Sequence, residues 1–413
     1  MLKLFIKKWL FLIFITLSNL FLAIRTSIGF FYFLFWVFIS SMGMGFVLLL
    51  LEYFLIKLKI ERSILCKAEE GDTLEIETLI ENNSFIPVFN FVLEDNLSCS
   101  DYQESKQRFL FEYLGRDLYE TAKYRCKCPK RGRYNIGPFV VYFFDPFGLF
   151  FLKKTYKIYS EIFVFPKTFP IRGFPPIRKG ILPWFGIATT HVSGNDDEFY
   201  GVREYREGDP IKRIHWISTA RKNRLIVKQF QRQVFFRATI LFNLEKEKNF
   251  GEGKDSVAEF MIRIAASVSR YLIERDISLD IIAGTESAVH IQSNRGVEHL
   301  QDILKFLTIA KIESKVGLGE IFEGFSRNIP DDSTLIVIML DKDWKYMPIM
   351  LPLEKRNISL IPLILISSTF QYVFEKKEVV KDIRIKLSKT FGFNPITFSR
   401  GDNLEEVFSQ ISI

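Results

Sequence analysis

The residues whose types could do chemistry gather in one charge-dense segment, residues 196–228, with six acidic and eight basic side chains. Its adjacent carboxylates, Asp197 and Glu198, are the kind of pair that a hydrolase uses for acid–base work. The alternative, which we favour, is a lattice of ion pairs that locks a loop, because guanidinium groups bind carboxylates bidentately. The arginines with that geometry are Arg203, Arg206 and Arg213, and their expected acceptors are Glu198, Glu204 and Asp209.

The near balance of charge in this segment also bears on partners. A nucleic-acid surface is positive throughout, so no nucleic acid is expected to bind here. Asp209 followed by Pro210 predicts the start of a short helix, since aspartate caps helices and proline suits their first turn.

Other familiar catalytic motifs are missing from the sequence. His191, His215, His290 and His299 form no paired zinc motif. Residues 251–256 lie where a phosphate-binding loop would sit, but Lys248 and Asp255 occupy positions that need glycine and a hydroxyl. We therefore expect a surface turn there, with Asp255 capping the next helix.

Cys126 and Cys128 alternate along a predicted strand and so share one face of it. A metal site needs further ligands at suitable spacing, and none is evident in the sequence. Packing within the strand is the expectation for both. Four cysteines in 413 residues also exclude a disulfide-stapled secreted scaffold.

Residues 1–60 predict a transmembrane hairpin with helices over 9–25 and 28–56, since both stretches are almost free of charge. Basic residues precede the first helix and follow the second, whereas Arg25 is alone between them. The positive-inside rule then places both ends, and the soluble domains, in the cytoplasm of an inner-membrane, multi-pass protein. The basic residues concerned are Lys3, Lys7, Lys8, Lys57, Lys59 and Arg62.

Three further segments and a final domain follow. Residues 61–165 alternate apolar and polar residues in short runs between turn signals, which predicts a small β-sandwich. Residues 166–192 are a proline-rich connector, and 193–232 are the charged segment. Residues 233–413 alternate strands and helices, with helices over 256–274 and 296–309, which predicts a parallel-type α/β domain. Pro362 argues against a central place for the strand over 358–366.

The charged segment resembles the signature of the domain-of-unknown-function-58 family of bacteria and archaea. Residues 196–210 read Asp-Asp-Glu-Phe-Tyr-Gly-Val-Arg-Glu-Tyr-Arg-Glu-Gly-Asp-Pro, followed by Arg-Ile-His-Trp at 213–216 and Ala-Arg at 220–221. Upstream matches are Arg-Gly-Arg-Tyr at 131–134, Gly-Pro at 137–138 and Asp-Pro-Phe-Gly-Leu at 145–149. The residues taken as signature and charge lattice are Glu198, Arg203, Tyr205, Arg206, Gly208, Asp209, Arg213, Trp216 and Arg221.

The resemblance implies a von Willebrand factor A-like, Rossmann-type fold for the α/β domain. It also implies partners: MoxR-type AAA+ ATPases and other von Willebrand A proteins. The metal-binding version of that fold needs Asp-x-Ser-x-Ser after its first strand, whereas residues 243–247 read Asn-Leu-Glu-Lys-Glu. We therefore expect no cofactor, and the residues left to hold Mg²⁺ are Asn243, Glu245 and Asp341.

These observations together predict a membrane-anchored, non-enzymatic accessory or scaffold protein that acts with a MoxR-type ATPase in protein maturation or complex assembly. Two alternatives stay open. One is a hydrolase that uses Asp197 and Glu198, and the other is an extracytoplasmic binding protein. No catalytic residue is carried over from the resemblance.

Overall fold

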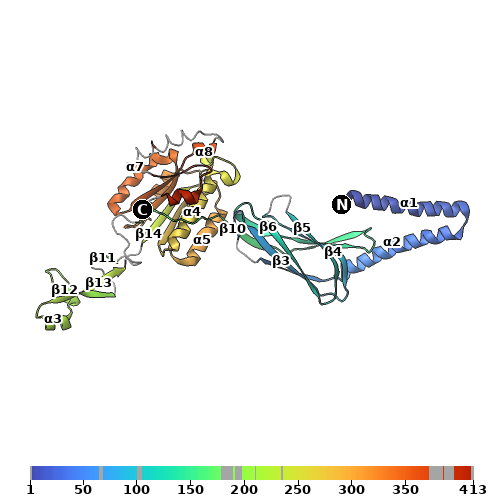
Figure 1. Cartoon of the computed structure of the whole chain (residues 1–413), viewed down its shortest axis with the longest axis horizontal. Helices are drawn as coiled ribbons and strands as arrows, with labels where there is room; N and C mark the ends of the chain where they lie inside the picture. The colour runs from blue at the N-terminus through green and yellow to red at the C-terminus, as the bar shows by residue number, and fades with distance from the viewer. Residues whose placement is uncertain are drawn as a thin grey trace. The chain divides into compact units, whose positions relative to one another are not determined.

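The computed structural model describes residues 2–64, 68–99, 105–177, 189–190, 198–209, 211–233, 236–371, 385 and 395–410. The chain forms two compact units, Met1–Lys167 and Thr168–Ile413 (Figure 1). The first holds two long helices and a set of strands, and the second holds a mixed α/β sheet and a separate small sheet. The structure is therefore mixed α and β, as the sequence predicts.

Two apolar helices open the first unit, α1 (Leu2–Thr26) and α2 (Gly29–Leu55). They pack side by side after a tight turn at Ser27, whose amide donates to the Ala23 carbonyl at 2.9 Å (Figure 1). Their large apolar side chains, such as Phe14 and Trp36, are mostly exposed. Among the described residues, α2 alone has both the length and the apolar composition to cross a membrane.

Ten strands follow in the first unit and form three sheets. Burial alternates along strands such as Thr73–Asn82 and Tyr119–Lys127, so one side of each of these is buried. One sheet has the order β1-β3-β6, with β1 (Leu58–Ile64), β3 (Thr73–Asn82) and β6 (Tyr119–Lys127). Another has the order β5-β4-β8-β9, with β4 (Val88–Asn96), β5 (Lys106–Leu114), β8 (Phe139–Phe144) and β9 (Phe151–Tyr156). The third has the order β2-β10-β7, with β2 (Ala68–Glu69), β7 (Gly132–Ile136) and β10 (Ser160–Phe165).

Two hydrophobic clusters join these sheets to one another. The first combines side chains of α2, β1, β3, β4 and β8, including Leu49, Ile80 and Phe91. The second combines β3, β6, β7 and β10 and includes Cys126 and Val164. Each cluster draws on more than one sheet, so the strands of the first unit share their cores.

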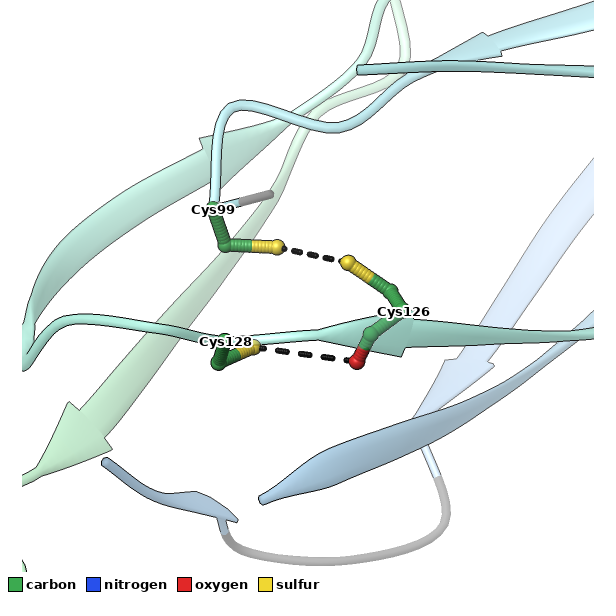
Figure 2. A group of neighbouring side chains, drawn as sticks. All are labelled: Cys99, Cys126 and Cys128. Carbon is green, nitrogen blue, oxygen red and sulfur yellow. Dashed lines mark hydrogen bonds between the residues drawn. The ribbon is translucent and has the colours of Figure 1, made fainter. Parts of the chain in front are cut away.

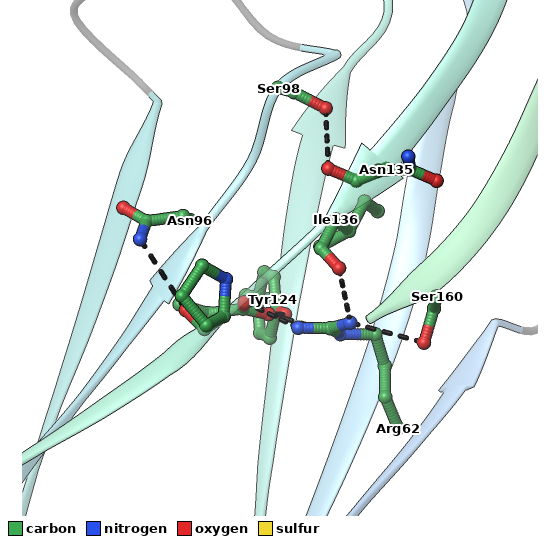
Figure 3. Close-up of polar contacts among 9 residues, drawn as sticks. Arg62, Asn96, Ser98, Tyr124, Asn135, Ile136 and Ser160 are labelled. Carbon is green, nitrogen blue, oxygen red and sulfur yellow. Dashed lines mark hydrogen bonds and ion pairs between the residues drawn. The ribbon is translucent and has the colours of Figure 1, made fainter. Parts of the chain in front are cut away.

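A fully buried ion pair connects strands of two different sheets. Arg62 on β1 and Asp95 on β4 form a bidentate contact, with distances of 2.5 Å (Nη2–Oδ1) and 3.2 Å (Nε–Oδ2). Figure 3 shows the remaining donors of Arg62 directed at the Ile136 carbonyl (3.0 Å) and the Ser160 hydroxyl (3.1 Å). The Tyr124 hydroxyl donates to Asp95. Burial raises the pKa of Asp95, although the charge of Arg62 opposes this. Arg62 therefore faces the interior of the first unit.

A turn after β8 holds the C-terminal half of α2. The buried Asp145 carboxylate accepts the backbone amides of Phe147 (3.1 Å), Leu149 (2.6 Å) and Phe150 (2.6 Å). A Cβ placed on Gly45 of α2 would lie 3.2 Å from both Asp145 Oδ2 and the Phe147 ring. The Asp-Pro-Phe-Gly-Leu motif is therefore a turn on which α2 packs closely.

A six-stranded sheet with the order β16-β15-β14-β17-β18-β19 forms the core of the second unit. All neighbours pair in parallel except the edge strand β16. Counted along the chain, this order is 3-2-1-4-5-6, the doubly wound arrangement. The strands are β14 (Arg237–Asn243), β15 (Ser278–Gly284), β16 (Ala288–Asn294), β17 (Thr334–Leu340), β18 (Ser359–Leu365) and β19 (Ile396–Phe398).

Helices pack on this sheet. The apolar face of α6 meets alternate residues of the central strands, such as Leu241 and Val337, in one cluster. The helices and turns are α4 (Val257–Ile273), α5 (Gly296–Ile309), α6 (Leu318–Phe325), α7 (Met347–Met350), α8 (Ser368–Gln371) and α10 (Leu404–Ser409), with 3-10 turns η2 (Lys246–Lys248), η3 (Gly253–Asp255), η4 (Asp341–Tyr346) and η5 (Leu351–Arg356).

Two local expectations for this unit were wrong. Ser256, not Asp255, caps α4, because its hydroxyl accepts the Glu259 amide at 3.4 Å while Asp255 ends a 3-10 turn. Pro362 lies in β18, which has neighbours on both sides. The short β19 pairs only with residues from Leu363 onward, so the missing amide of Pro362 falls outside that ladder.

Candidate functional site

The charged segment folds into a small unit that we call the hairpin module, residues 198–233 without Pro210. Strands β12 (Glu198–Glu204) and β13 (Ile226–Gln233) pair antiparallel, and the two residues of β11 (Thr189–Thr190) add to β13. Between β12 and β13 lie a turn, the 3-10 turn η1 (Ile211–Arg213) and the short helix α3 (Trp216–Lys222). The module thus displays its connecting segment on a two-stranded support.

A bidentate ion pair fixes the turn of the hairpin module. Nη1 and Nη2 of Arg203 each lie 2.6 Å from one carboxylate oxygen of Asp209. The same carboxylate accepts the Arg206 amide at 2.8 Å, and Gly208 supplies the positive φ of +101° that the turn requires. The hydrogen bond from Arg203 and the one from the Arg206 amide lower the pKa of Asp209. Asp209 therefore braces the turn that precedes η1, close to where the sequence predicts the start of a short helix.

Exposed apolar side chains follow this braced turn in the sequence. Ile211 is 71 % exposed, and Trp216 and Ile217 are each 64 % exposed. Ile214, on the other side of the same segment, is buried and bridges Val227 of β13. Ile214 is thus buried against the strands of the module, whereas the three other large apolar side chains are exposed to solvent. We call Ile211, Trp216 and Ile217 the apolar patch. Isolated exposed apolar residues are ordinary, but a group of them marks interaction surfaces.

The remaining signature residues are distributed around the module. Arg203, Arg206, Gly208 and Asp209 meet in the turn, whereas Trp216 and Arg221 lie on α3. Tyr205 continues the ladder through its amide, which donates to the Leu225 carbonyl at 2.9 Å, and Arg213 is half-buried in η1. Glu204 pairs with Arg224 instead of with one of the three expected arginines. Asp197 and the side chain of Glu198 lie outside the described residues.

The described histidines lie on separate elements. His215 precedes α3 and its Nδ1 is 2.7 Å from the Ser218 hydroxyl, whereas His299 on α5 meets the Leu279 carbonyl at 2.8 Å. His290 on β16 lies 3.5 Å from Asp280. His191 lies outside the described residues.

The residues left to hold Mg²⁺ lie at the carboxyl ends of β14 and β17, where doubly wound sheets bind ligands. In this chain the place is occupied by a lysine, because Lys248 Nζ lies 2.7 Å from Glu245 and 2.8 Å from Asp343. Burial alone would lower the pKa of Lys248, but its hydrogen bonds to these carboxylates outweigh burial and raise it.

Asn243 and Asp341 have other partners at this edge. Asn243 donates its amide to the Val316 carbonyl at 2.7 Å, and Asp341 accepts the Ser367 amide at 3.1 Å. Of the three residues left for Mg²⁺, Glu245 is therefore paired with an ammonium group, whereas Asn243 and Asp341 contact backbone groups. Sequence reasoning missed Lys248, although it lies only three residues after Glu245.

Sequence reasoning missed the apolar patch, because Ile211, Ile214 and Ile217 recur at the helical spacing that is typical of a buried face. The signal lay in the charge density around them, which makes a buried helix face at this point unfavourable.

Comparison with known proteins supports the family resemblance for part of the chain. Residues 201–346 match the model of a family described as a protein of unknown function, DUF58. This match covers the hairpin module from Gly201 onward and strands β14 to β17 of the α/β sheet. No curated protein matches the chain.

Similarities to solved structures are slight. The CARDB domain of the PF1109 protein from Pyrococcus furiosus, in complex with di-metal ions, is 14 % identical with a TM-score of 0.20, over 27 % of this chain and 90 % of that one. The ApaA protein from Bordetella pertussis is 13 % identical with a TM-score of 0.20, over 26 % and 94 %. The alkylpurine DNA glycosylase AlkC from Pseudomonas fluorescens is 12 % identical with a TM-score of 0.17, over 26 % and 30 %. At such TM-scores none of them supports an argument about this chain.

Proposed function

We propose that the chain is a membrane-anchored, non-enzymatic accessory protein that docks a MoxR-type AAA+ ATPase through its hairpin module, in protein maturation or complex assembly. The observation that carries the proposal is the apolar patch of Ile211, Trp216 and Ile217 within the family-matched segment. Tryptophan is enriched among the residues that dominate binding energy at protein interfaces. The choice of an ATPase, and of other von Willebrand A proteins as companions, comes from the family resemblance.

The braced turn supports a binding role over a catalytic one. Asp209 spends both carboxylate oxygens on Arg203 and the Arg206 amide, so it is not free to move protons. A rigid turn beside exposed apolar side chains reduces the ordering cost of binding, which favours a stable contact surface. The hydrolase alternative rests on Asp197 and Glu198 and gains no support from the described side chains.

The anchor in this proposal is the pair α1 and α2, inserted as a hairpin. At 1.5 Å per residue α2 is about 40 Å long, about 10 Å more than the hydrocarbon core of a bilayer. The C-terminal turns of α2, from Gly45 onward, pack on the Asp145 turn and the strands. Lys57 and Lys59 then lie just past the membrane, and with the basic N-terminal residues they favour a cytoplasmic location for both units.

The finer fold assignments belong to the same proposal. The two sheets that share the first cluster form a β-sandwich, and the doubly wound sheet of the second unit is von Willebrand factor A-like. In that domain, the Glu245–Lys248–Asp343 contact stands where the metal-binding version of the fold has its ion.

The proposal is tested by affinity capture of the tagged full chain from detergent-solubilised membranes in the presence of ATP. We expect a AAA+ ATPase to be recovered with the native chain. Loss of an interface tryptophan costs about 2 kcal/mol or more, so Trp216→Ala should reduce recovery by about thirtyfold. Trp344→Ala is the matched control, because Trp344 is also partly exposed but lies in η4. Equal recovery with both variants, or recovery of no ATPase with the native chain, would contradict the proposal.

A further inference from the structure

Three of the four cysteines of the chain meet in the interior of the first unit. The sulfur atoms of Cys99, Cys126 and Cys128 all lie within 4.8 Å of one another, and those of Cys99 and Cys126 are 3.2 Å apart. Figure 2 shows the three side chains converging from two segments of the chain. The fourth cysteine, Cys66, lies outside the described residues.

The fold, rather than local sequence, brings the three residues together. Cys126 lies near the end of β6 and Cys128 just beyond it, and the alternation of the strand directs both side chains to the buried side. Cys99 is 27 positions before Cys126, in the turn that follows β4. Because β4 and β6 belong to different sheets, the trio lies where the two sheets come together.

The spacing of the sulfur atoms suits a single metal ion. Zinc bound by thiolates has bonds of about 2.3 Å in a tetrahedron, which puts neighbouring sulfur atoms about 3.8 Å apart. The observed separations, from 3.2 Å to no more than 4.8 Å, bracket that value. Small rotations of the side chains would equalise them. Sulfur ligands also select soft ions such as Zn²⁺ over Mg²⁺ or Ca²⁺.

The surroundings distinguish this trio from cysteines on a protein surface. The three residues are at most 2 % exposed, and they belong to a cluster that includes Leu74 and Val164. Cysteine packs well in apolar cores as a small hydrophobic residue, so burial alone carries no information. Packing does not, however, require three sulfur atoms to converge on one point, whereas a metal ion does.

We propose that Cys99, Cys126 and Cys128 bind one Zn²⁺ ion that links the turn after β4 to the end of β6. The ion replaces thiol protons on binding, and the three thiolates leave a fourth coordination position for another ligand. The site is structural, because its three ligands are buried and would cross-link the turn after β4 to the end of β6 within the cluster that holds Leu74 and Val164.

The test uses the full chain, purified in detergent under reducing conditions and stripped of metal with a chelator. Added Zn²⁺ should bind at one equivalent per chain, measured by elemental analysis after gel filtration. Co²⁺ as a probe should give the intense thiolate-to-metal absorption of a sulfur-bound tetrahedral ion. Thermal unfolding of the unaltered chain should shift to lower temperature on stripping and return on addition of Zn²⁺, which requires no substitution.

Variants locate the site. Cys99→Ser, Cys126→Ser and Cys128→Ser should each weaken Zn²⁺ binding by more than about tenfold, the loss expected when even a supporting residue of a metal site is removed. Ala122→Ser is the matched control, since Ala122 is buried on the same face of β6 and the change adds a hydroxyl without removing a thiol. It should bind Zn²⁺ as the native chain does.

Three results would overturn the proposal. One is the absence of Zn²⁺ uptake by the reduced native chain. Another is uptake that survives all three cysteine substitutions. The last is a Cys99–Cys126 disulfide, found by peptide mass spectrometry in chain isolated from cells with its thiols blocked, which would make the cluster a redox pair instead.

Discussion

The buried pair of Arg62 and Asp95 allows a quantitative prediction about the first unit. Neither side chain has any exposed area, so Asp95→Asn would leave a guanidinium charge in the interior without a counter-ion. Breaking a buried ion pair from one side costs about 3–5 kcal/mol. Arg62 would keep its hydrogen bonds to Ile136 and Ser160 and its stacking on the Phe139 ring, 4.2 Å away, so we expect the lower end of that range.

The assay is amide hydrogen exchange of the full chain in detergent, read by mass spectrometry on peptides from β4 and β6. Peptide resolution matters because a chain of two units has no single unfolding free energy. A loss of about 3 kcal/mol raises the opening constant about 150-fold, and protection in these strands should fall by that factor.

Two controls make the result specific. Glu75→Gln breaks an exposed pair with Arg125 on the same sheet, where the distance is 2.7 Å, and should cost less than about 1 kcal/mol. The double variant Arg62→Met, Asp95→Asn has no unpaired guanidinium in the interior. It should therefore be less destabilised than the single variant Asp95→Asn. Exchange in Asp95→Asn no faster than in Glu75→Gln would refute the reasoning.

Three other predictions concern separate places in the chain. Asp145→Ala removes the acceptor of three backbone amides and should destabilise the first unit by about 2–4 kcal/mol, seen as faster exchange in β8 and β9. Gly284→Ala puts a Cβ 2.1 Å from Asn243 Oδ1 and should lower the stability of the α/β sheet by about 1–3 kcal/mol, measured by thermal unfolding. An unchanged unfolding temperature would show that Asn243 moves aside without cost. Arg203 lowers the pKa of Asp209 below its ordinary value of 3.8. The ion pair should therefore stabilise the hairpin module fully above pH 3.8, and this stabilisation should be lost as the pH falls through the lowered pKa. Acid proteolysis of the module should show this loss, and Arg203→Lys should shift it to higher pH.

Much of the architecture was predictable because the signals were local. The uncharged stretches anticipate the apolar helices α1 and α2, and the alternation of apolar and polar residues within 61–165 anticipates strands such as β3, since these patterns are carried by neighbouring residues. The helix at Gly296–Ile309 has the predicted bounds. The family match to residues 201–346 likewise agrees with motifs read directly from the sequence.

The features that escaped prediction depend on contacts between distant residues. The ion pair of Arg62 escaped because its partner is 33 positions away on another sheet. The approach of Cys99 to Cys126 and Cys128 escaped because it comes only through the turn after β4. The three residues of β19 are too few to show the alternation of a strand in the sequence. Without β19, the strand that contains Pro362 looks like an edge strand. Each of these contacts depends on how distant strands and turns are arranged in space. A local sequence pattern does not encode that arrangement.

Site-specific photo-crosslinking in living cells tests the central claim, docking through the hairpin module, most directly. A photoreactive residue is placed at Ile217 in the apolar patch and, as a control, at Val297, which is 69 % exposed on α5. We expect the Ile217 position to crosslink to a AAA+ ATPase in the presence of ATP and the Val297 position not to. Equal crosslinking from both positions, or an Ile217 position that crosslinks to no ATPase, would contradict it.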